Sequence, residues 1–339
     1  FYEDKKADMS FVISAAESIL PVLREGNLVV LESTSPPLTT RNLVQPILEK
    51  SGLKAGKDFK LAYSPERVLP GQILKELVGN ARVIGGIDPS SAEAGRDLYA
   101  TFVQGEIVLT DSTTSEMVKL MENTYRDINI AAANEFSRLA DRFGVDIWEA
   151  IAIANRHPRV KILNPGPGVG GHCISVDPWF FVESAPDITP LIRTARRVND
   201  SQPEFAARLI EEALIGAGGN RVACLGLSYK PDVDDLRESP AVEVVKLLVN
   251  AEEDVSYFEP FKPDFEIKGA RRCESLAEAI KDAQVVVLLV GHSQFKQLKP
   301  EDIQPLTSAE TIVDTVNGWN AGQFQAAGFQ VVRLGVGKK

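Results

Sequence analysis

The stretch SEMVKLMENTYRDINIAAANEFSRLADRFG (Ser115–Gly144) decides the domain organisation that this sequence predicts. Apolar residues recur along it on helical stripes, at Met117, Leu120, Ile128 and Phe136. Thr113, with Glu116 three residues later, matches a capping box and predicts the start of the helix, and Gly144 predicts its end. A helix of this length is typical of a linker that packs on two domains or on a second subunit.

An α/β pattern precedes this helix. Strands are expected at 28–33, 60–65, 82–87 and 106–110, and helices at 11–23, 39–50 and 90–102. Such alternation predicts a parallel sheet with covering helices.

A second α/β pattern follows the helix and begins at Asn220. Strands are expected at 221–229, 254–260, 285–291 and 311–315, with helices at 239–251 and 276–283. A ligand of such a domain lies outside the carboxyl ends of the strands, where the sequence places YKPDVDDLRESP (229–240), GHSQF (291–295) and VNGW (316–319). The predicted fold is α/β, with two doubly wound Rossmann-like domains joined by the long central helix.

Composition limits the possible partners. The chain has 339 residues, 44% of them hydrophobic and 25% charged, which suffices for two or three cored domains. A net charge of -10 argues against a broad nucleic-acid surface, so any phosphate must meet a local basic cluster. Seven basic residues near predicted loops could hold a diphosphate: Arg156, Arg159, Arg193, Arg196, Arg197, Lys230 and Arg237.

Location and metal content follow from what the sequence lacks. No run of 18 apolar residues and no signal peptide is present, so we expect a cytoplasmic protein without a membrane partner. Three cysteines without Cys-x-x-Cys spacing suit a reducing compartment and suggest neither a disulfide framework nor a metal site.

The loop PGPGVGGHCISVDPWF (Pro165–Phe180) contains a formal Gly-x-Gly-x-x-Gly match and a cysteine. Prolines interleave with its glycines, and the proline-broken run VESAPDITP follows, so the strand and helix of a dinucleotide-binding turn are missing. The composition instead predicts backbone that passes close to another group. Cys173 is flanked by glycine, histidine and aspartate, which favours a nucleophile over the alternative of a buried small hydrophobe. His172 points away from its neighbour in extended backbone and is a poor base for it.

Other polar residues give weaker signals. Lys119 and Asn123 lie one helical turn apart on one face, but with Thr124 and Arg126 they also fit a solvated stripe, which the local sequence favours. Glu66 follows a strand and a proline at a carboxyl end of the first sheet, where ligands bind, yet a loop carboxylate is usually just solvated.

Five segments in this order resemble the UDP-sugar dehydrogenases of the UDP-glucose/GDP-mannose dehydrogenase family. They are ESTSP (32–36), AYSPERVLPGQ (62–72), EMVKLMENTYRDINIAAANE (116–135), GVGGHCISVDPWF (168–180) and LGLSYKPDVDDLRESP (225–240). The resemblance implies an enzyme that uses NAD to oxidise the C6 alcohol of a nucleotide sugar to a carboxylate in two steps. It also implies that the first, glycine-rich part of the NAD domain precedes residue 1, so that this Rossmann domain is incomplete at its N-terminus.

The resemblance extends to substrate and domains. GGHCISVDPWF, preceded by ANRHPRVKILNPGPG, resembles the branch acting on UDP-N-acetylhexosamines. The expected substrate is UDP-N-acetyl-D-mannosamine, whose uronate would serve surface polysaccharide synthesis. One alternative is the same oxidation with UDP-N-acetyl-D-glucosamine as the substrate. The other is a protein that binds a UDP-sugar without catalysis. The implied domains are the NAD-binding part (1–110), a central helical domain with the cysteine loop (111–202) and a UDP-binding domain (203–339).

The family's catalytic roles transfer by motif. Cys173 matches the nucleophile that forms a thiohemiacetal and then a thioester. Glu66 matches the residue that positions the hydrolytic water or acts as base. Lys119 and Asn123 match the groups that stabilise oxyanions. Asp177 and Thr34, the latter also beside the cofactor, are expected to organise the thiol, a water and the lysine.

Binding roles transfer in the same way. The implied substrate contacts are Arg67, Val68, Leu69, His157, Arg159, Gly166, Gly168 and Lys230, and the implied NAD contacts are Ser33, Thr34 and Arg237. His157 and Arg159 would reach the substrate of the neighbouring subunit in a homodimer built by the central helix. Val176 and VNGW (316–319) depart from the UDP-glucose enzymes, which often carry a lysine and an arginine there.

Overall fold

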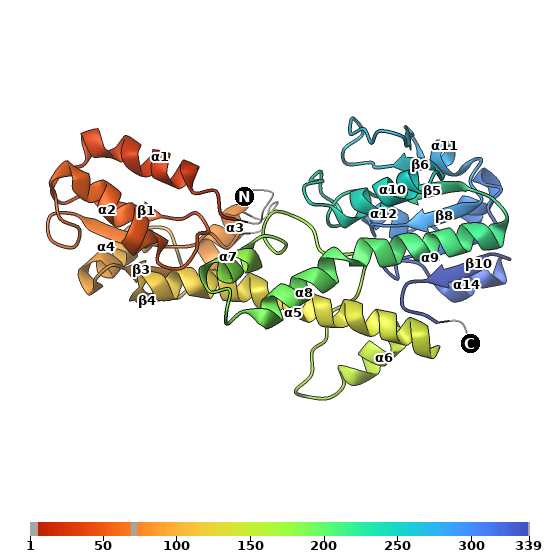
Figure 1. The fold of residues 1–339 in the computed structure, drawn as a ribbon, viewed down its shortest axis with the longest axis horizontal. Helices are drawn as coiled ribbons and strands as arrows, with labels where there is room; N and C mark the ends of the chain where they lie inside the picture. Colours follow the sequence, from red (N-terminus) through yellow and green to blue (C-terminus); the bar gives the residue numbers. More distant parts are fainter. Residues whose placement is uncertain (1–5, 69–72, 338–339) are drawn as a thin grey trace. The chain divides into compact units, whose positions relative to one another are not determined.

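The computed structural model describes residues 6–68 and 73–337. The chain divides into two compact units, residues 1–125 with 176–193, and residues 126–175 with 194–339. Helix α5 (Ser112–Phe143) begins in the first unit and ends in the second (Figure 1). The long helix therefore joins two α/β units, as predicted.

The first unit contains a four-stranded sheet in the order β1-β2-β3-β4. Its strands are β1 (Leu28–Leu31), β2 (Lys60–Tyr63), β3 (Arg82–Gly86) and β4 (Ile107–Asp111). The pairs β1–β2 and β3–β4 are parallel, but β2 and β3 are antiparallel, with Ala62 opposite Gly86. The prediction of a wholly parallel sheet is wrong at this pair, because alternation of helices and strands does not specify the direction of each strand.

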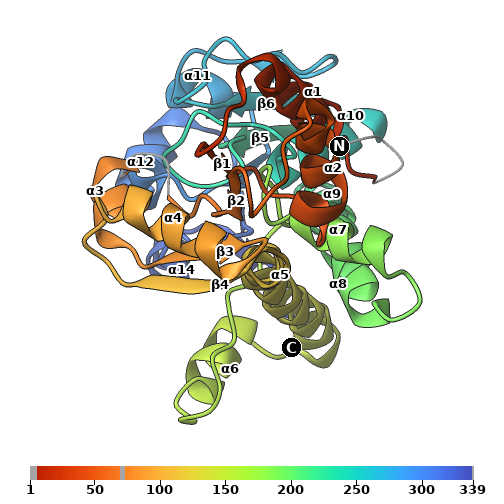
Figure 2. The same ribbon diagram turned by 90° about the vertical axis from the view of Figure 1, so that its left-hand side faces the viewer.

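Helices cover both faces of this sheet (Figure 2). Helix α4 (Pro89–Tyr99) packs on the face of Ala62 and Ile84. Helices α1 (Ser10–Ile19) and α2 (Gln45–Leu48) pack on the opposite face, around Leu61. Because successive strand residues point to opposite faces, Leu61 and Ala62 serve the two cores. The short helix α3 (Ile73–Gly79) was not predicted.

The second unit contains a six-stranded sheet, all parallel, in the order β10-β9-β8-β5-β6-β7. Its strands are β5 (Arg221–Leu225), β6 (Asp254–Phe258), β7 (Arg271–Arg272), β8 (Val285–Leu288), β9 (Thr311–Asp314) and β10 (Gln330–Arg333). One face carries α9 (Gln202–Ala217) and α10 (Pro240–Asn250), and the other α11 (Leu276–Ile280), α12 (Ser293–Lys296) and α14 (Ala321–Ala326). The doubly wound prediction is confirmed, with a switch in strand order beside β5.

The start of α5 differs from the predicted capping box. The Asp111 carboxylate accepts hydrogen bonds from Thr114 N (3.0 Å) and Thr114 Oγ1 (2.5 Å), and so caps the helix. Glu116 is fully buried and accepts from the backbone N–H groups of Leu38 and Thr40, both at 2.7 Å. It therefore anchors the loop after β1 and does not cap its own helix.

A buried polar network joins the second half of α5 to α8 (Pro190–Asp200). Arg196 forms an ion pair with Asp127, and Asn199 Nδ2 donates to Asp127 Oδ1 at 2.8 Å. Asn134 Nδ2 donates to Asn199 Oδ1 at 2.9 Å.

Two further helices lie between α5 and α8 in the sequence, α6 (Ile147–Ala154) and α7 (Asp177–Ser184). In the described residues, no helix is both long and apolar enough to cross a membrane, and no cluster of His, Cys, Asp and Glu could hold a metal ion.

Candidate active site

The glycine loop before α7 docks on the loop from Tyr229 to Pro240. Gly171 N donates to Arg237 O at 3.1 Å, and a Cβ added to Gly171 would lie 2.6 Å from the Tyr229 ring. Gly168 has φ +149, and its added Cβ would lie 2.8 Å from Pro240 Cβ. Larger residues would strain the backbone and collide, which confirms that the loop is glycine-rich because backbone approaches another group.

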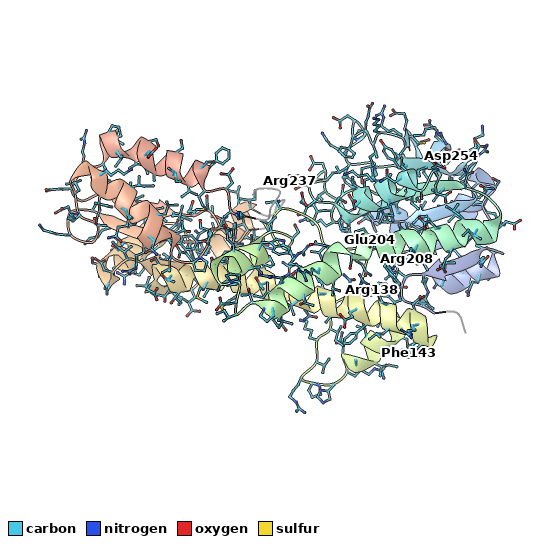
Figure 3. The ribbon with its side chains drawn as sticks, viewed as in Figure 1. Arg138, Phe143, Glu204, Arg208, Arg237 and Asp254 are labelled. Atoms are coloured by element: carbon cyan, nitrogen blue, oxygen red, sulfur yellow. The ribbon has the colours of Figure 1, made fainter. Side chains whose placement is uncertain are left out.

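Arg237 and Asp235 of the Tyr229–Pro240 loop lie beside His172, the neighbour of the cysteine in the glycine loop. Cys173 is partly exposed, and the adjacent His172 accepts a hydrogen bond at Nδ1 from Arg237 Nη2 (3.1 Å). Arg237, labelled in Figure 3, also pairs with Asp235 at 2.7 Å. The hydrogen bond to Asp235 is the main cause that raises the pKa of Arg237, and Cys173 adds to it. Arg237 and Cys173 therefore interact electrostatically.

Lys119, Asn123 and Asp177 form a cluster in the first unit. Asn123 Nδ2 donates to Asp177 Oδ2 at 2.5 Å. Burial raises the pKa of Asp177 to about 6, although Asn123 and the charge of Lys119 act in the opposite direction. Asn123 and Thr124 are buried, so the solvated-stripe interpretation of this helix face is wrong for them, whereas Arg126 is exposed.

Tyr63 lies close to this cluster and escaped sequence reasoning. Its hydroxyl is fully buried and has no hydrogen-bond partner within the described part of the chain. Burial is the main cause that raises the pKa of Tyr63, with contributions from Glu116 and Asp177. The phenol therefore stays protonated. Its only sequence signal was its place at the end of a predicted strand in AYSPE.

Glu66 is held firmly at the carboxyl end of β2. Its Oε1 accepts from the backbone N–H groups of Arg67 (2.6 Å) and Val68 (3.0 Å), and its Oε2 lies 3.4 Å from Arg82 Nη2. The alternative of a merely solvated carboxylate is therefore wrong. Arg67 itself pairs with Glu122, with its Nε 3.2 Å from Glu122 Oε2.

The other expected binding residues occupy several places. Ser33 is exposed and Thr34 partly buried just after β1, and Leu69 lies outside the described residues. His157 and Arg159 are exposed after α6, where His157 Nδ1 accepts from Arg159 N at 3.4 Å. Gly166 N donates to Asn134 Oδ1 at 3.0 Å, and Lys230 Nζ lies 5.5 Å from the Tyr229 ring centroid.

One of the basic residues expected near a diphosphate is unsuitable. Arg196 is only 1% exposed and pairs with Asp127 and Asp200. Its guanidinium thus belongs to the α5–α8 network, and its assignment as a diphosphate ligand is wrong.

A buried histidine at the carboxyl ends of β5, β6 and β8 was also missed. His292 is fully buried, donates from Nε2 to Glu259 Oε2 (3.0 Å), and accepts at Nδ1 from Asp232 N (2.9 Å). Glu259 also accepts from Leu227 N at 2.6 Å. The pair therefore anchors the loop that carries Lys230. Its sequence signal was the predicted loop GHSQF.

Three family models cover most of the chain. The NAD binding domain of the UDP-glucose/GDP-mannose dehydrogenase family matches residues 1–103, its central domain residues 113–201 and its UDP binding domain residues 223–321. The chain belongs to the UDP-glucose/GDP-mannose dehydrogenase family. The predicted resemblance, an oxidoreductase with NAD as its cofactor, is thereby confirmed.

Similar proteins agree along nearly the whole chain. A UDP-N-acetyl-D-mannosamine dehydrogenase of Methanocaldococcus jannaschii is 48% identical over 99% of this chain and 76% of its own length. An NDP-N-acetyl-D-galactosaminuronic acid dehydrogenase of Ralstonia solanacearum is 44% identical, over 96% and 78%. The solved UDP-D-ManNAc dehydrogenase of Pyrococcus horikoshii superposes with a TM-score of 0.91 at 42% identity, over 99% and 79%.

Proposed function

We propose that this protein oxidises the C6 alcohol of UDP-N-acetyl-D-mannosamine to the carboxylate in two NAD-dependent steps, through a thioester on Cys173. The observation that carries the proposal is the partly exposed Cys173 on a glycine loop locked to the Tyr229–Pro240 loop, beside the Arg237 guanidinium. The similarity to dehydrogenases of UDP-N-acetyl-D-mannosamine supports the sugar.

The residues expected near NAD fit an anionic dinucleotide. Ser33 and Thr34 offer hydroxyl donors after β1, at the carboxyl edge where such ligands bind, and the Arg237 side chain is 65% exposed. We propose that these residues hold the ribose and diphosphate portions. When bound, NAD supplies the hydride acceptor for both oxidations.

The chain's own groups would handle the carbon centre. The thiolate of Cys173 attacks the C6 aldehyde, and the resulting alkoxide is stabilised by the ammonium of Lys119 and the amide of Asn123. Oxidation of this thiohemiacetal gives the thioester. Cys173 and Asp177 are four residues apart, so the chain itself limits their Cα separation to about 14 Å. Asp177, with Thr34, keeps the amide and the lysine oriented.

Hydrolysis completes the reaction. Glu66 orients a water toward the thioester carbonyl, the C–S bond breaks, and Cys173 is regenerated as a thiolate. The sugar nucleotide would be held by Arg67, Val68, Leu69, Gly166, Gly168 and Lys230, with His157 and Arg159 reaching the neighbouring subunit. The functional domains proposed are 1–110 for NAD, 111–202 for the cysteine loop and dimer, and 203–339 for UDP.

We further propose a homodimer through the central helix. Phe136, Leu139 and Phe143 on α5 are 42%, 44% and 71% exposed, and they line an apolar groove of 320 Å³ with α6. A second copy of the same surface would cover it. The cysteine usage supports a cytoplasmic enzyme, and the uronate product would suit surface polysaccharide synthesis.

The test is turnover of single nucleotide sugars with NAD. We expect UDP-N-acetyl-D-mannosamine to give NADH with a kcat/KM at least about tenfold above that of UDP-N-acetyl-D-glucosamine, a difference of about 1.4 kcal/mol in transition-state binding. If the enzyme prefers UDP-N-acetyl-D-glucosamine, the proposed substrate is wrong, but the proposed two-step oxidation through Cys173 stands. Tight binding of both without NADH would support a binding protein without catalysis.

A further inference from the structure

Two arginines are buried in the described part of the chain, and their surroundings differ. Arg196 pairs with the fully buried Asp127 inside a helix interface, which is a structural arrangement. Arg82 is also buried, with its side chain 6% exposed, but its carboxylate partners Glu66 and Glu32 are 43% and 51% exposed. The buried guanidinium therefore interacts with two carboxylates that are themselves accessible to a ligand.

The reversed direction of β3 explains this placement. Tyr63 pairs with Gly85 and Ala62 with Gly86 in the antiparallel register of β2 and β3. Continuing that register beyond the ladder sets Arg82 opposite Glu66. The first residue of β3 therefore lies at the carboxyl end of β2, where ligands of such sheets bind.

The guanidinium is fixed from several sides. Arg82 Nη1 lies 3.3 Å from Ser64 Oγ and 3.5 Å from Glu32 Oε1, while its Nη2 lies 3.4 Å from Glu66 Oε2. Its Cζ stands 4.4 Å from the centroid of the Tyr99 ring. Together these contacts fix the orientation of the planar guanidinium of Arg82, with its Nη2 directed at Glu66.

Glu66 then has few acceptor positions left. A carboxylate offers about four lone-pair sites. The Arg67 and Val68 N–H groups use Oε1, and Arg82 uses one site of Oε2. Among contacts with described residues, the acceptor site that is left is on Oε2, and its direction is set by the other three contacts.

We propose that Arg82 is a positioning residue that holds Glu66 as an oriented carboxylate, so that the last site of Oε2 receives the water that hydrolyses the thioester. This inference rests on the proposed function. The water oxygen bonds to the thioester carbon, its proton passes to Glu66 Oε2 and on to solvent, and the C–S bond pair leaves with the Cys173 sulfur. Removing Arg82 should therefore slow hydrolysis and spare both oxidations.

The experiment follows the covalent adduct on Cys173 during turnover of UDP-N-acetyl-D-mannosamine with NAD, by intact mass and rapid-mixing NADH absorbance. The variants are Arg82→Gln, the conservative Arg82→Lys, Glu66→Gln as reference and Arg96→Gln as matched control, because Arg96 is an arginine of the same unit whose carboxylate partner, Asp97, lies at the surface. We expect Arg82→Gln and Glu66→Gln to show the NADH burst, accumulate the thioester and lose about 100-fold in steady-state rate. Arg82→Lys should recover part of the rate, and Arg96→Gln should stay within about threefold of the wild type.

Each outcome separates the two proposals. If Glu66→Gln accumulates the thioester while both Arg82 variants release product at the wild-type rate, the positioning role is wrong and the function stands. If Arg82→Gln fails to fold, Arg82→Lys decides by the same readout. If neither the wild type nor Glu66→Gln ever carries an adduct on Cys173, the proposed function fails, and this inference with it.

Discussion

Single side chains differ in how far their local sequence reveals them. Cys173 could be singled out because glycine, histidine and aspartate flank it, a local signal. Glu116 and Arg82 could not, since each acts on a residue far along the chain: Thr40 lies 76 positions from Glu116, and Glu66 lies 16 positions from Arg82. For the same reason the burial of Asn123 against Asp177, 54 positions away, overturned the solvated-stripe interpretation.

Asp177 makes folding stability depend on pH. Its pKa is raised from 3.8 to about 6 by burial, so the folded state binds the proton more tightly than the unfolded state. The contribution of this proton to the free energy of unfolding is fully present below pH 3.8 and is lost as the pH rises to about 6. Since one pKa unit corresponds to about 1.4 kcal/mol, the wild type should lose about 3 kcal/mol relative to Asp177→Asn across this window. Urea unfolding of both proteins at pH 4 and pH 7 measures the difference, and equal differences at both pH values would contradict the raised pKa.

Activity should depend on the same group with the opposite sign. The carboxylate form accepts the Asn123 hydrogen bond and attracts Lys119, so the rate of the wild type should fall as pH drops below about 6. Asp177→Asn should be slower and should lack this acid limb in kcat/KM. An unchanged acid limb in the variant would assign that titration to another group.

Some helices and strands were predictable from their apolar periodicity. Helix α5 and the buried strands β5 and β8 follow the sequence pattern closely. Helices α8 and α9 were missed, and in α8 the buried side chains include Arg196 and Asn199, so burial there does not follow the apolar residues alone. The direction of β3 has no sequence signature either, although it brings Arg82 to Glu66.

The exposed apolar end of α5 should determine the oligomeric state. Phe143→Glu places a charge in the proposed dimer groove, and we expect the dimer dissociation constant to rise at least about 30-fold, as for loss of a hot-spot residue. Phe11→Glu on α1 is the matched control, because Phe11 is 80% exposed and lies outside the groove. Sedimentation velocity over a concentration series measures both variants. A Phe143→Glu protein as dimeric as the wild type would contradict the proposed interface.

For the chain as a whole, the order of its motifs carried more information than any one of them. The α/β pattern predicted two Rossmann-like units, and the ordered segments identified the family that the comparisons confirm. The polar contacts that hold the glycine loop, from Asn134 to Gly166 and from Arg237 to Gly171, join residues distant in sequence and required the structure. The catalytic assignment of Cys173 remains a proposal for which stoichiometry is the most direct test.

The decisive measurement is the number of NADH molecules formed per molecule of UDP-N-acetyl-D-mannosamine, for the wild type and for Cys173→Ser at limiting sugar. The thioester route predicts two NADH for the wild type, whereas Cys173→Ser, without its thiolate, should stop before the second oxidation. Two NADH from the serine variant at the wild-type rate, or none from a wild type that binds the sugar nucleotide, would contradict the route through Cys173.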